Sequence, residues 1–428
     1  MKLWNKDGNS NNKVDNFTVG EDRKNDLEIA KYDCIASISH AKMLKKIDIL
    51  NTQELKEIKS VLNKIKDDAE KGILEIENEF EDIHSKIEFV LVDKLGEVGK
   101  KIHTGRSRND QVLVAMQLFL IDSLNDIKSL VVSLFDVLMK LSESHKDQLM
   151  PGYTHLQVAM PSSFGLWFSA YAESLIDDII FINSAIKVLD QNPLGSAAGF
   201  GSSFNIDRNF TTKDLGFKFL KINSISAQMN RGKIEKSTSI CLSMIASTIS
   251  KLSMDICLYM GQDYNFISFP KDLTTGSSIM PHKKNPDIFE IIRGKSNLIQ
   301  SLPNQFIILT SNLPSGYHRE FQLTKGPIIN GIKELKSCIR MMIDTLPKII
   351  VSDKIINQDK YKYVYTVDTI NNKVQKGESF RNAYKTLIDE IKSDKYKKPK
   401  SVNYSHIGSI GNLSLNLIKE KLKHFLKA

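Results

Sequence analysis

The chain has 428 residues, of which 41% are hydrophobic and 25% charged, with a formal net charge of +9. This composition is typical of a soluble globular protein, and no apolar run approaches the roughly 18 residues that a membrane helix needs. The N-terminus lacks the apolar core of a signal peptide, and the four cysteines form no C-x-x-C pair. We therefore expect a cytoplasmic protein without disulfides or a zinc site.

The positive net charge comes mainly from lysines that are scattered along the chain. Only Tyr396–Lys400 forms a short basic cluster. Nucleic-acid binding and a base-composition bias in the coding DNA would both produce such a surplus. We favour the second explanation, because no nucleic-acid-binding motif accompanies the charge.

The N-terminal part of the chain has helical periodicity. Apolar residues recur at spacings of three and four over 25–74 and over 80–95, and strand-like alternation is absent. A polar, glycine-containing loop follows at 96–111.

The middle of the chain predicts three long helices, over 112–150, 161–191 and 233–260. The first contains neither glycine nor proline, and a helix of that length would extend about 50 Å. Such helices cannot bury their apolar stripes within a compact domain of their own. They indicate a long bundle that is shared between subunits.

Shorter helices are predicted near the C-terminus, over 287–302, 326–346 and 380–392. From residue 352 onward the segments are shorter and more polar, which indicates a small C-terminal domain. No stretch has the pattern of a strand network, so the predicted fold class is all-α.

The segment Thr274–Glu290 reads T-T-G-S-S-I-M-P-H-K-K-N-P-D-I-F-E. Pro281 and Pro286 exclude a helix interior, which makes this segment a loop. Its hydroxyls, amide and lysines are suited to an anionic ligand. The alternative is an ordinary helix connection with solvated lysines.

Two further loops carry candidate groups. His103–Gln111 reads H-T-G-R-S-R-N-D-Q, in which arginine side chains offer planar forks for carboxylates. The alternative there is a helix cap, with Asn109 or Asp110 at the N-cap. The second loop, Met150–Pro161, contains His155, which is either catalytic or a structural histidine.

Other kinds of site are not supported. The small residues of Asn192–Arg208 suggest close backbone packing or a ligand-facing turn, without a phosphate-loop motif. His84, within E-D-I-H, lacks a second metal ligand at helical spacing, and no G-x-S-x-G elbow is present. The remaining chemistry is acid–base catalysis on an anionic small molecule, without a metal or cofactor.

Together these loops resemble the fumarase/aspartase superfamily. Gly276–Asn285 matches its signature G-S-S-x-M-P-x-K-x-N at every defined position. Within the superfamily the chain is similar to the argininosuccinate lyase branch, through His103–Gln111, through P-G-Y-T-H-L-Q at Pro151–Gln157 and through the spacing of Tyr317, Gln322 and Lys325. The resemblance covers nearly the whole chain.

The resemblance implies a central bundle of long helices flanked by two smaller helical domains. We place the three domains at 1–105, 106–351 and 352–428. It further implies a homotetramer whose active sites take loops from different subunits, with no nucleic-acid or membrane partner and no cofactor.

The implied reaction is the reversible cleavage of argininosuccinate to arginine and fumarate in arginine biosynthesis. By the family pattern Ser277 is the base and His155 the acid, and Glu290 is hydrogen-bonded to that histidine. Lys283 and the loop's backbone N–H groups would stabilise the serine alkoxide. The residues carried over as contacts to the substrate or to its developing charge are Arg108, Asn109, Thr154, Asn285, Tyr317, Gln322 and Lys325.

Some positions depart from the family pattern and concern the arginine half of the substrate. Glu320–Lys325 reads E-F-Q-L-T-K where D-L-Q-E-D-K is common, and Ser226 stands where an aspartate is usual. Asp22 stands nearest to the position of a substrate-facing serine. His282 is shared with adenylosuccinate lyases, so an adenylosuccinate lyase-type enzyme and a catalytically silent structural homologue are the alternatives.

Overall fold

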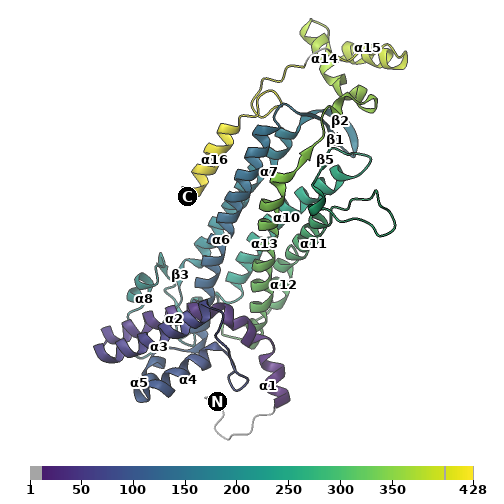
Figure 1. The fold of residues 1–428 in the computed structure, drawn as a ribbon. Coiled ribbons are helices and arrows are strands. Elements are labelled where there is room, and N and C mark those ends of the chain that lie inside the picture. The colour runs from purple at the N-terminus through teal and green to yellow at the C-terminus, as the bar shows by residue number, and fades with distance from the viewer. Residues whose placement is uncertain (1–11, 400–401, 428) are drawn as a thin grey trace. The chain divides into compact units, whose positions relative to one another are not determined.

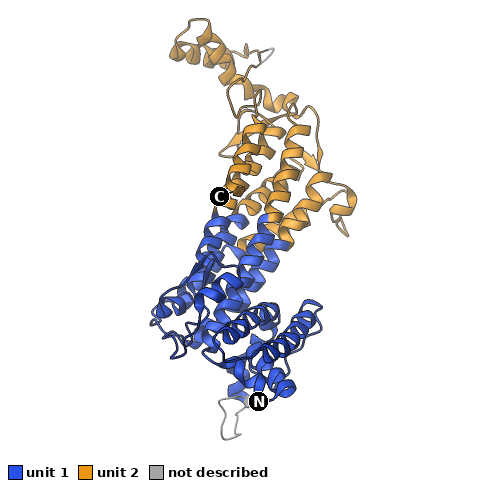
Figure 2. Ribbon diagram, turned by 90° about the vertical axis from the view of Figure 1, so that its left-hand side faces the viewer, with its two compact units in different colours: residues 1–128, 181–246, 298–336 blue, residues 129–180, 247–297, 337–428 orange. Residues whose placement is uncertain are grey.

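The computed structural model describes residues 12–399 and 402–427 and is predominantly helical (Figure 1). This confirms the predicted all-α fold class. The chain forms two compact units (Figure 2). Unit 1 comprises Met1–Lys128, Phe181–Ala246 and Leu298–Lys336, and unit 2 comprises Ser129–Ile180, Ser247–Asn297 and Ser337–Ala428. The predicted boundaries near residues 105 and 351 fall outside the helices, and the three-domain division stays a prediction.

Unit 1 contains short and medium-length helices and one small parallel strand pair. Its helices are α1 (Asn12–Val19), α2 (Asp22–Lys46), α3 (Thr52–Glu70), α4 (Ile83–Leu95), α5 (Glu97–Lys100), α8 (Arg208–Asp214), α9 (Ser224–Gln228) and α12 (Leu302–Leu309). Two 3₁₀-helices are η1 (Lys101–His103) and η3 (Arg319–Thr324), and the strands are β3 (Gln191–Asn192) and β4 (Phe219–Leu220).

Unit 2 contains two antiparallel strand pairs and the C-terminal helices. The strands are β1 (Leu149–Thr154) with β2 (Gln157–Ser163), and β5 (Ile267–Ser268) with β6 (Ile350–Val351). Its helices are α14 (Thr366–Gln375), α15 (Phe380–Lys392) and α16 (Leu415–Lys427), with η2 (Lys271–Leu273), η4 (Leu346–Lys348), η5 (Ile355–Asn357) and η6 (Asp359–Tyr365).

Five helices contribute residues to both units. They are α6 (Arg108–Ser144), α7 (Phe164–Leu189), α10 (Lys233–Met260), α11 (Asp287–Ile299) and α13 (Lys325–Thr345). The predicted bounds of α10 are confirmed, and those of α11 and α13 differ by a few residues. Among the described residues α10 is the one helix long and apolar enough to cross a membrane by length and composition alone. Part of that apolar composition packs in the core, since Ile234, Leu242, Ile245 and Ile256 are fully buried.

The longest helix, α6, begins four residues earlier than predicted because of a reciprocal cap. Ser107 Oγ accepts a hydrogen bond from the backbone N–H of Asn109 at 3.2 Å. The carboxylate of Asp110 accepts one in return from the N–H of Ser107 at 3.0 Å. This arrangement resembles a capping box, although the serine accepts from the second helical residue and not the third, and it satisfies N–H groups that a helix start leaves without partners. The cap expected at Asn109 or Asp110 is therefore Ser107.

The segment Met150–Pro161, expected to be a loop, is largely a β-hairpin, and this part of the prediction is wrong. Leu149 pairs with Ser163, and Thr154 pairs with Gln157 across the turn. The register shifts between Pro151 and Tyr153. Proline lacks an N–H to donate and is tolerated at such irregularities and at strand edges, so the prolines do not prevent pairing here.

The core of unit 2 includes an aromatic cluster with one partly buried acceptor. Asp255 Oδ2 accepts hydrogen bonds from Trp167 Nε1 at 3.0 Å and from the Tyr171 hydroxyl at 2.6 Å. The Trp167 ring packs against Phe168 and Tyr259. The cluster thus satisfies the polar ends of its aromatic residues while burying their rings.

A buried carboxylate in unit 2, that of Asp178, forms no ion pair with any residue that the structure describes. Asp178 on α7 is 2% exposed, and its Oδ2 has no hydrogen-bond partner among the described residues. Burial raises the pKa of this carboxyl to about 7, although a hydrogen bond with Thr248 opposes the shift. An uncharged carboxylic acid is favoured in such surroundings.

We predict that Asp178→Asn stabilises the protein more at pH 8 than at pH 5. In the wild type only the unfolded chain loses the Asp178 proton between its ordinary pKa and about 7, so wild-type stability falls as the pH rises through that window. The asparagine variant avoids this loss, which is on the order of 2 kcal/mol. Thermal unfolding of the wild type and of Asp178→Asn at pH 5 and pH 8 measures this difference in stability. An equal effect of the substitution at both would contradict the prediction.

Candidate functional site

The predicted site residues divide between the two units. Arg108, Asn109, Tyr317, Gln322 and Lys325 belong to unit 1, and all five line one cavity there. The remaining predicted residues belong to unit 2, namely Thr154, His155, Ser277, Lys283, Asn285 and Glu290.

The unit 1 cavity has a volume of about 140 Å³ and contains charges of both signs. Several of its lining residues were not predicted as site residues: Asp22, Glu81, Asp82, His84, Val112, Arg231 and Arg319. The acidic cluster before His84 was a usable signal, because two carboxylates next to a histidine at a helix start are unusual.

Lys325 is a deeply buried cation of the unit 1 cavity. Its Nζ lies 2.7 Å from Asp26 Oδ1 and 3.1 Å from Asp22 Oδ2, and the residue is 3% exposed. Burial alone would lower the pKa of this lysine, but the two carboxylates raise it above its usual value. Lys325 is therefore a charged residue that the fold itself requires.

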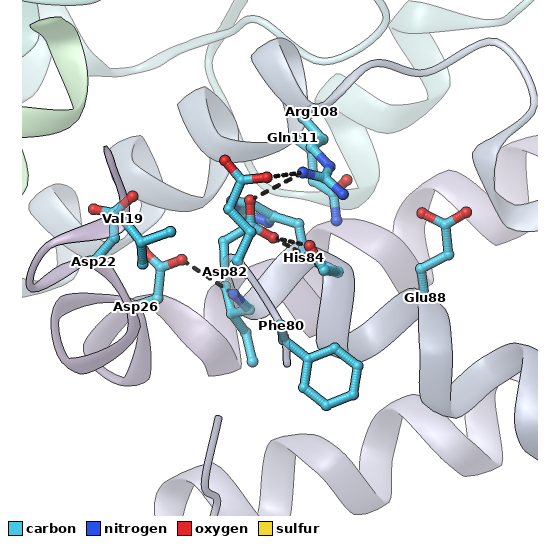
Figure 3. A network of polar contacts seen from close by, with 12 residues as sticks. Val19, Asp22, Asp26, Phe80, Asp82, His84, Glu88, Arg108 and Gln111 are labelled. Carbon is cyan, nitrogen blue, oxygen red and sulfur yellow. Dashed lines mark hydrogen bonds and ion pairs between the residues drawn. The ribbon is translucent and has the colours of Figure 1, made fainter. Parts of the chain in front are cut away.

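A second ion-pair group lies on the same cavity (Figure 3). Arg108 Nη1 lies 3.2 Å from Glu81 Oε2 and 3.4 Å from Asp82 Oδ2. Arg319 Nη2 lies 2.7 Å from the other oxygen of Glu81. Asp82 is also the N-cap of α4, where it accepts from the Ser85 N–H at 2.7 Å. The cap explains why this acidic segment is fixed at the cavity.

A buried polar layer extends inward from His84 in the cavity wall. His84 Nδ1 lies 2.7 Å from Asp33 Oδ2, and Gln111 Nε2 donates to the same carboxylate. Burial alone would raise the pKa of Asp33, but His84 holds it below its usual value. Burial would lower the pKa of His84, whereas Asp33 raises it. Arg106, a candidate carboxylate fork by sequence, is buried here and donates to Ser37 Oγ at 2.8 Å.

The segment Asn192–Arg208 packs closely against the start of α6. Asp110 Oδ2 accepts hydrogen bonds from the backbone N–H groups of Gly195 and Ala197, both at 2.9 Å. A Cβ at Gly195 would lie 2.8 Å from the Arg208 side chain, and its φ is +84°. Of the two roles expected for this segment, the structure supports close backbone packing.

In unit 2 the loop between Thr275 and Asn285 is closed at its base. The two residues form an antiparallel bridge, with Asn285 N–H donating to the Thr275 carbonyl at 2.8 Å. The Thr275 hydroxyl also donates to the Asp287 carboxylate. The segment Gly276–Lys284 lies between these two paired residues, and α11 begins at Asp287.

Within this loop the Ser277 side chain caps a local turn. Its Oγ accepts hydrogen bonds from the backbone N–H of Met280 at 3.1 Å and of Ile279 at 3.4 Å. Two N–H dipoles directed at one oxygen stabilise negative charge on it. Lys283, Asn285 and Glu290 line a neighbouring cavity of about 570 Å³, together with His282 and Cys257.

His155 occupies the tip of the β1–β2 hairpin. His155 and Leu156 have φ values of +53° and +58°, which is the backbone of a type I′ turn. Asparagine and glycine are usual there, and two residues with larger side chains carry strain, which persists at positions where function requires it. His155 and Thr154 are exposed, and no hydrogen bond or ion pair joins His155 to Glu290 within the described chain.

We predict that Lys325→Met lowers stability strongly, because it leaves Asp26 buried with an unpaired charge. Breaking a buried ion pair in this way costs about 3–5 kcal/mol. Lys333, on the same helix, forms an exposed pair with Glu28 at 2.6 Å and provides the matched control Lys333→Met. Calorimetry of the two variants compares their midpoints of thermal unfolding. Similar midpoints would show that the buried Lys325 ion pair contributes no more to stability than the exposed Lys333 pair.

The chain matches known proteins over nearly its full length. A model of the lyase family matches residues 5–300. The argininosuccinate lyase of Phocaeicola vulgatus is 47% identical over 99% of this chain and 95% of its own. The argininosuccinate lyase of Thermotoga neapolitana is 40% identical over 92% of this chain and 99% of its own.

Solved structures share the fold at lower sequence identity. A variant of EDDS lyase with bound fumarate has a TM-score of 0.77 and 20% identity, over 94% of this chain and 87% of its own. The class II fumarase of Schistosoma mansoni has a TM-score of 0.73 and 19% identity, over 86% and 85%. These structures support the fold, whereas the sequence relatives show the family. The chain belongs to the argininosuccinate lyase family.

Proposed function

We propose that the protein catalyses the reversible elimination of fumarate from argininosuccinate, releasing L-arginine. A base removes a proton from the succinyl carbon next to a carboxylate. An acid then gives a proton to the departing guanidinium nitrogen as the carbon–nitrogen bond breaks. The chemistry requires a base that tolerates negative charge and groups that hold a doubly charged, carbanion-like intermediate.

The observation that carries this proposal is the environment of Ser277. A serine hydroxyl is a weak base unless its alkoxide is stabilised. The N–H groups of Met280 and Ile279 are already directed at its oxygen, before substrate binds. Lys283 on the same loop adds positive charge. Preorganised donors of this kind stabilise charge without a reorganisation cost during the reaction.

The remaining roles follow the family pattern. His155 donates the proton to the leaving nitrogen, with Glu290 as its partner. Lys283, Asn285 and Arg108 stabilise the charge that develops on the substrate. Further substrate contacts are assigned to Asn109, Thr154, Tyr317, Gln322 and Lys325.

We also propose a homotetramer in which each active site draws on several subunits. This explains how residues of unit 1 and unit 2 serve one reaction. Large apolar side chains are exposed on helices of the proposed bundle, and such exposure is typical of an interface. Examples are Ile240 and Met244 on α10, Ile291 and Leu298 on α11, and Ile307 and Ile308 on α12. We place the enzyme in arginine biosynthesis in the cytoplasm.

We predict that Ser277→Ala abolishes fumarate release, which is followed by ultraviolet absorbance, because the variant has no group to take the proton. Ser278→Ala is the matched control and should retain activity within a few-fold. Assaying the wild type on adenylosuccinate in parallel tests the adenylosuccinate lyase alternative. Inactive wild-type protein would favour a catalytically silent homologue. Full activity of Ser277→Ala would exclude this serine as the base.

We predict that two inactive variants restore activity when their subunits mix. Ser277→Ala removes a unit 2 group and Arg108→Gln a unit 1 group. If a site combines these groups from different subunits, random association leaves about a quarter of sites intact. Co-expression with two affinity tags, followed by assay of the doubly tagged fraction, measures the recovery. If mixed tetramers recover no activity, then one and the same subunit supplies both Ser277 and Arg108 to each active site.

A further inference from the structure

The tip of the β1–β2 hairpin is exposed, and Tyr153 connects it to the core of unit 2. All residues from Thr154 to Val158 are exposed, whereas Tyr153 is half-buried. The Tyr153 ring packs edge-on against Tyr264, with 5.4 Å between the ring centroids, and tilted against Phe266 at 6.3 Å. Phe266 is fully buried. The residue directly before the exposed tip is therefore part of an aromatic cluster.

A side chain from the C-terminal region completes this cluster. Tyr361 on η6 is 2% exposed, and its ring packs edge-on against Phe266 at 6.2 Å. The Tyr153 hydroxyl donates a long hydrogen bond of 3.3 Å to the Tyr361 hydroxyl. The neighbouring Lys360 fixes η6 in turn, because its Nζ donates to the Asp263 carbonyl at 2.9 Å. The hairpin is thus supported by a residue 208 positions further along the chain.

The backbone of the tip requires such support. His155 and Leu156 have φ values of +53° and +58°. This left-handed conformation is unfavourable for residues other than glycine, and it persists only where the surrounding structure fixes it. Both residues are exposed, so their own packing cannot fix it. The contacts of Tyr153, two residues before His155, supply the constraint.

On the basis of the proposed function, we propose that Tyr153 and Tyr361 are positioning residues for proton transfer by His155. Their contact holds the strained tip so that the imidazole reaches the leaving nitrogen within hydrogen-bond distance, about 2.6–3.2 Å. Tyr361 acts through Tyr153 and does not itself transfer a proton. Most of the assigned substrate contacts lie outside the hairpin, so loss of this support should affect catalysis more than substrate affinity.

The first test measures kcat and KM of the full-length protein. Tyr361→Leu removes the ring and the hydroxyl, and we expect it to lower kcat on the order of 100-fold, as small misplacements of a catalytic group do. Tyr361→Phe keeps the ring and should lower kcat about 5-fold, the size of one net hydrogen bond. KM should change less than kcat in both variants.

A matched control lies on the same 3₁₀-helix. Tyr363 is 39% exposed, and its ring packs against Tyr396. Tyr363→Leu should therefore leave kcat within about two-fold of the wild type. A loss as large as that of Tyr361→Leu would overturn the proposal, because it would show that any tyrosine lost from η6 has this effect.

The second test asks whether proton transfer is the affected step. An analogue of argininosuccinate with an oxygen atom next to the guanidine, as in canavanine, has a less basic leaving group. Departure of such a group depends less on an acid. Both Tyr361 variants should therefore lose less activity on this analogue than on argininosuccinate. A purely structural defect would reduce turnover of the two substrates equally and would overturn the proposal.

Two further outcomes are decisive. If Tyr361→Leu does not fold, Tyr361→Phe decides by the same comparison, and an unchanged kcat in that variant would overturn the proposal. If the wild type does not cleave argininosuccinate, the proposed function is rejected, and hydrogen exchange of residues 149–163 tests whether Tyr361 holds the hairpin. Faster exchange in Tyr361→Phe than in Tyr363→Leu supports that role, and equal exchange excludes it.

Discussion

The buried contact between Lys325 and Asp26 is the interaction on which the unit 1 cavity depends. It joins residues 299 positions apart, at the start of α13 and within α2. A lysine and a carboxylate lose most of their hydration in such a position, so each is tolerable only in the presence of the other. This mutual requirement fixes η3, which carries Arg319 and Gln322, against the segment that carries Asp22. Gln322 reinforces the junction by donating to the carbonyls of Thr18 and Val19.

The helices could be predicted because the features that determine them, apolar spacing and suitable end residues, are local in the sequence. The bounds of α10 and α15 follow from apolar spacing with suitable ends, and the structure has them at Lys233–Met260 and Phe380–Lys392. The β1–β2 hairpin could not be predicted in the same way. Proline and glycine punctuate its sequence, and strand formation depends on pairing between Leu149 and Ser163, which no local pattern encodes.

The site shows the same division between local and distant information. The motif around Ser277 was identified because its residues are consecutive, and the motif at Arg108 for the same reason. Glu81, Asp82 and Arg231 were not identified as site residues, because their significance lies in what they face. Arg108 is 27 positions from Glu81, and Phe321, which accepts from Arg231, is 90 positions from it. Contacts between residues so far apart in the sequence become visible only in the folded structure.

The left-handed backbone at His155 limits which substitutions can test its proposed role as the proton donor. Most replacements there would change the chemistry and the turn together, because alanine and β-branched residues resist a φ of +53°. Asparagine accepts this backbone readily and lacks a titratable ring. An asparagine variant therefore removes the proposed acid and leaves the hairpin intact. An alanine variant at the same position would disturb both, so a loss of activity could not be attributed to either.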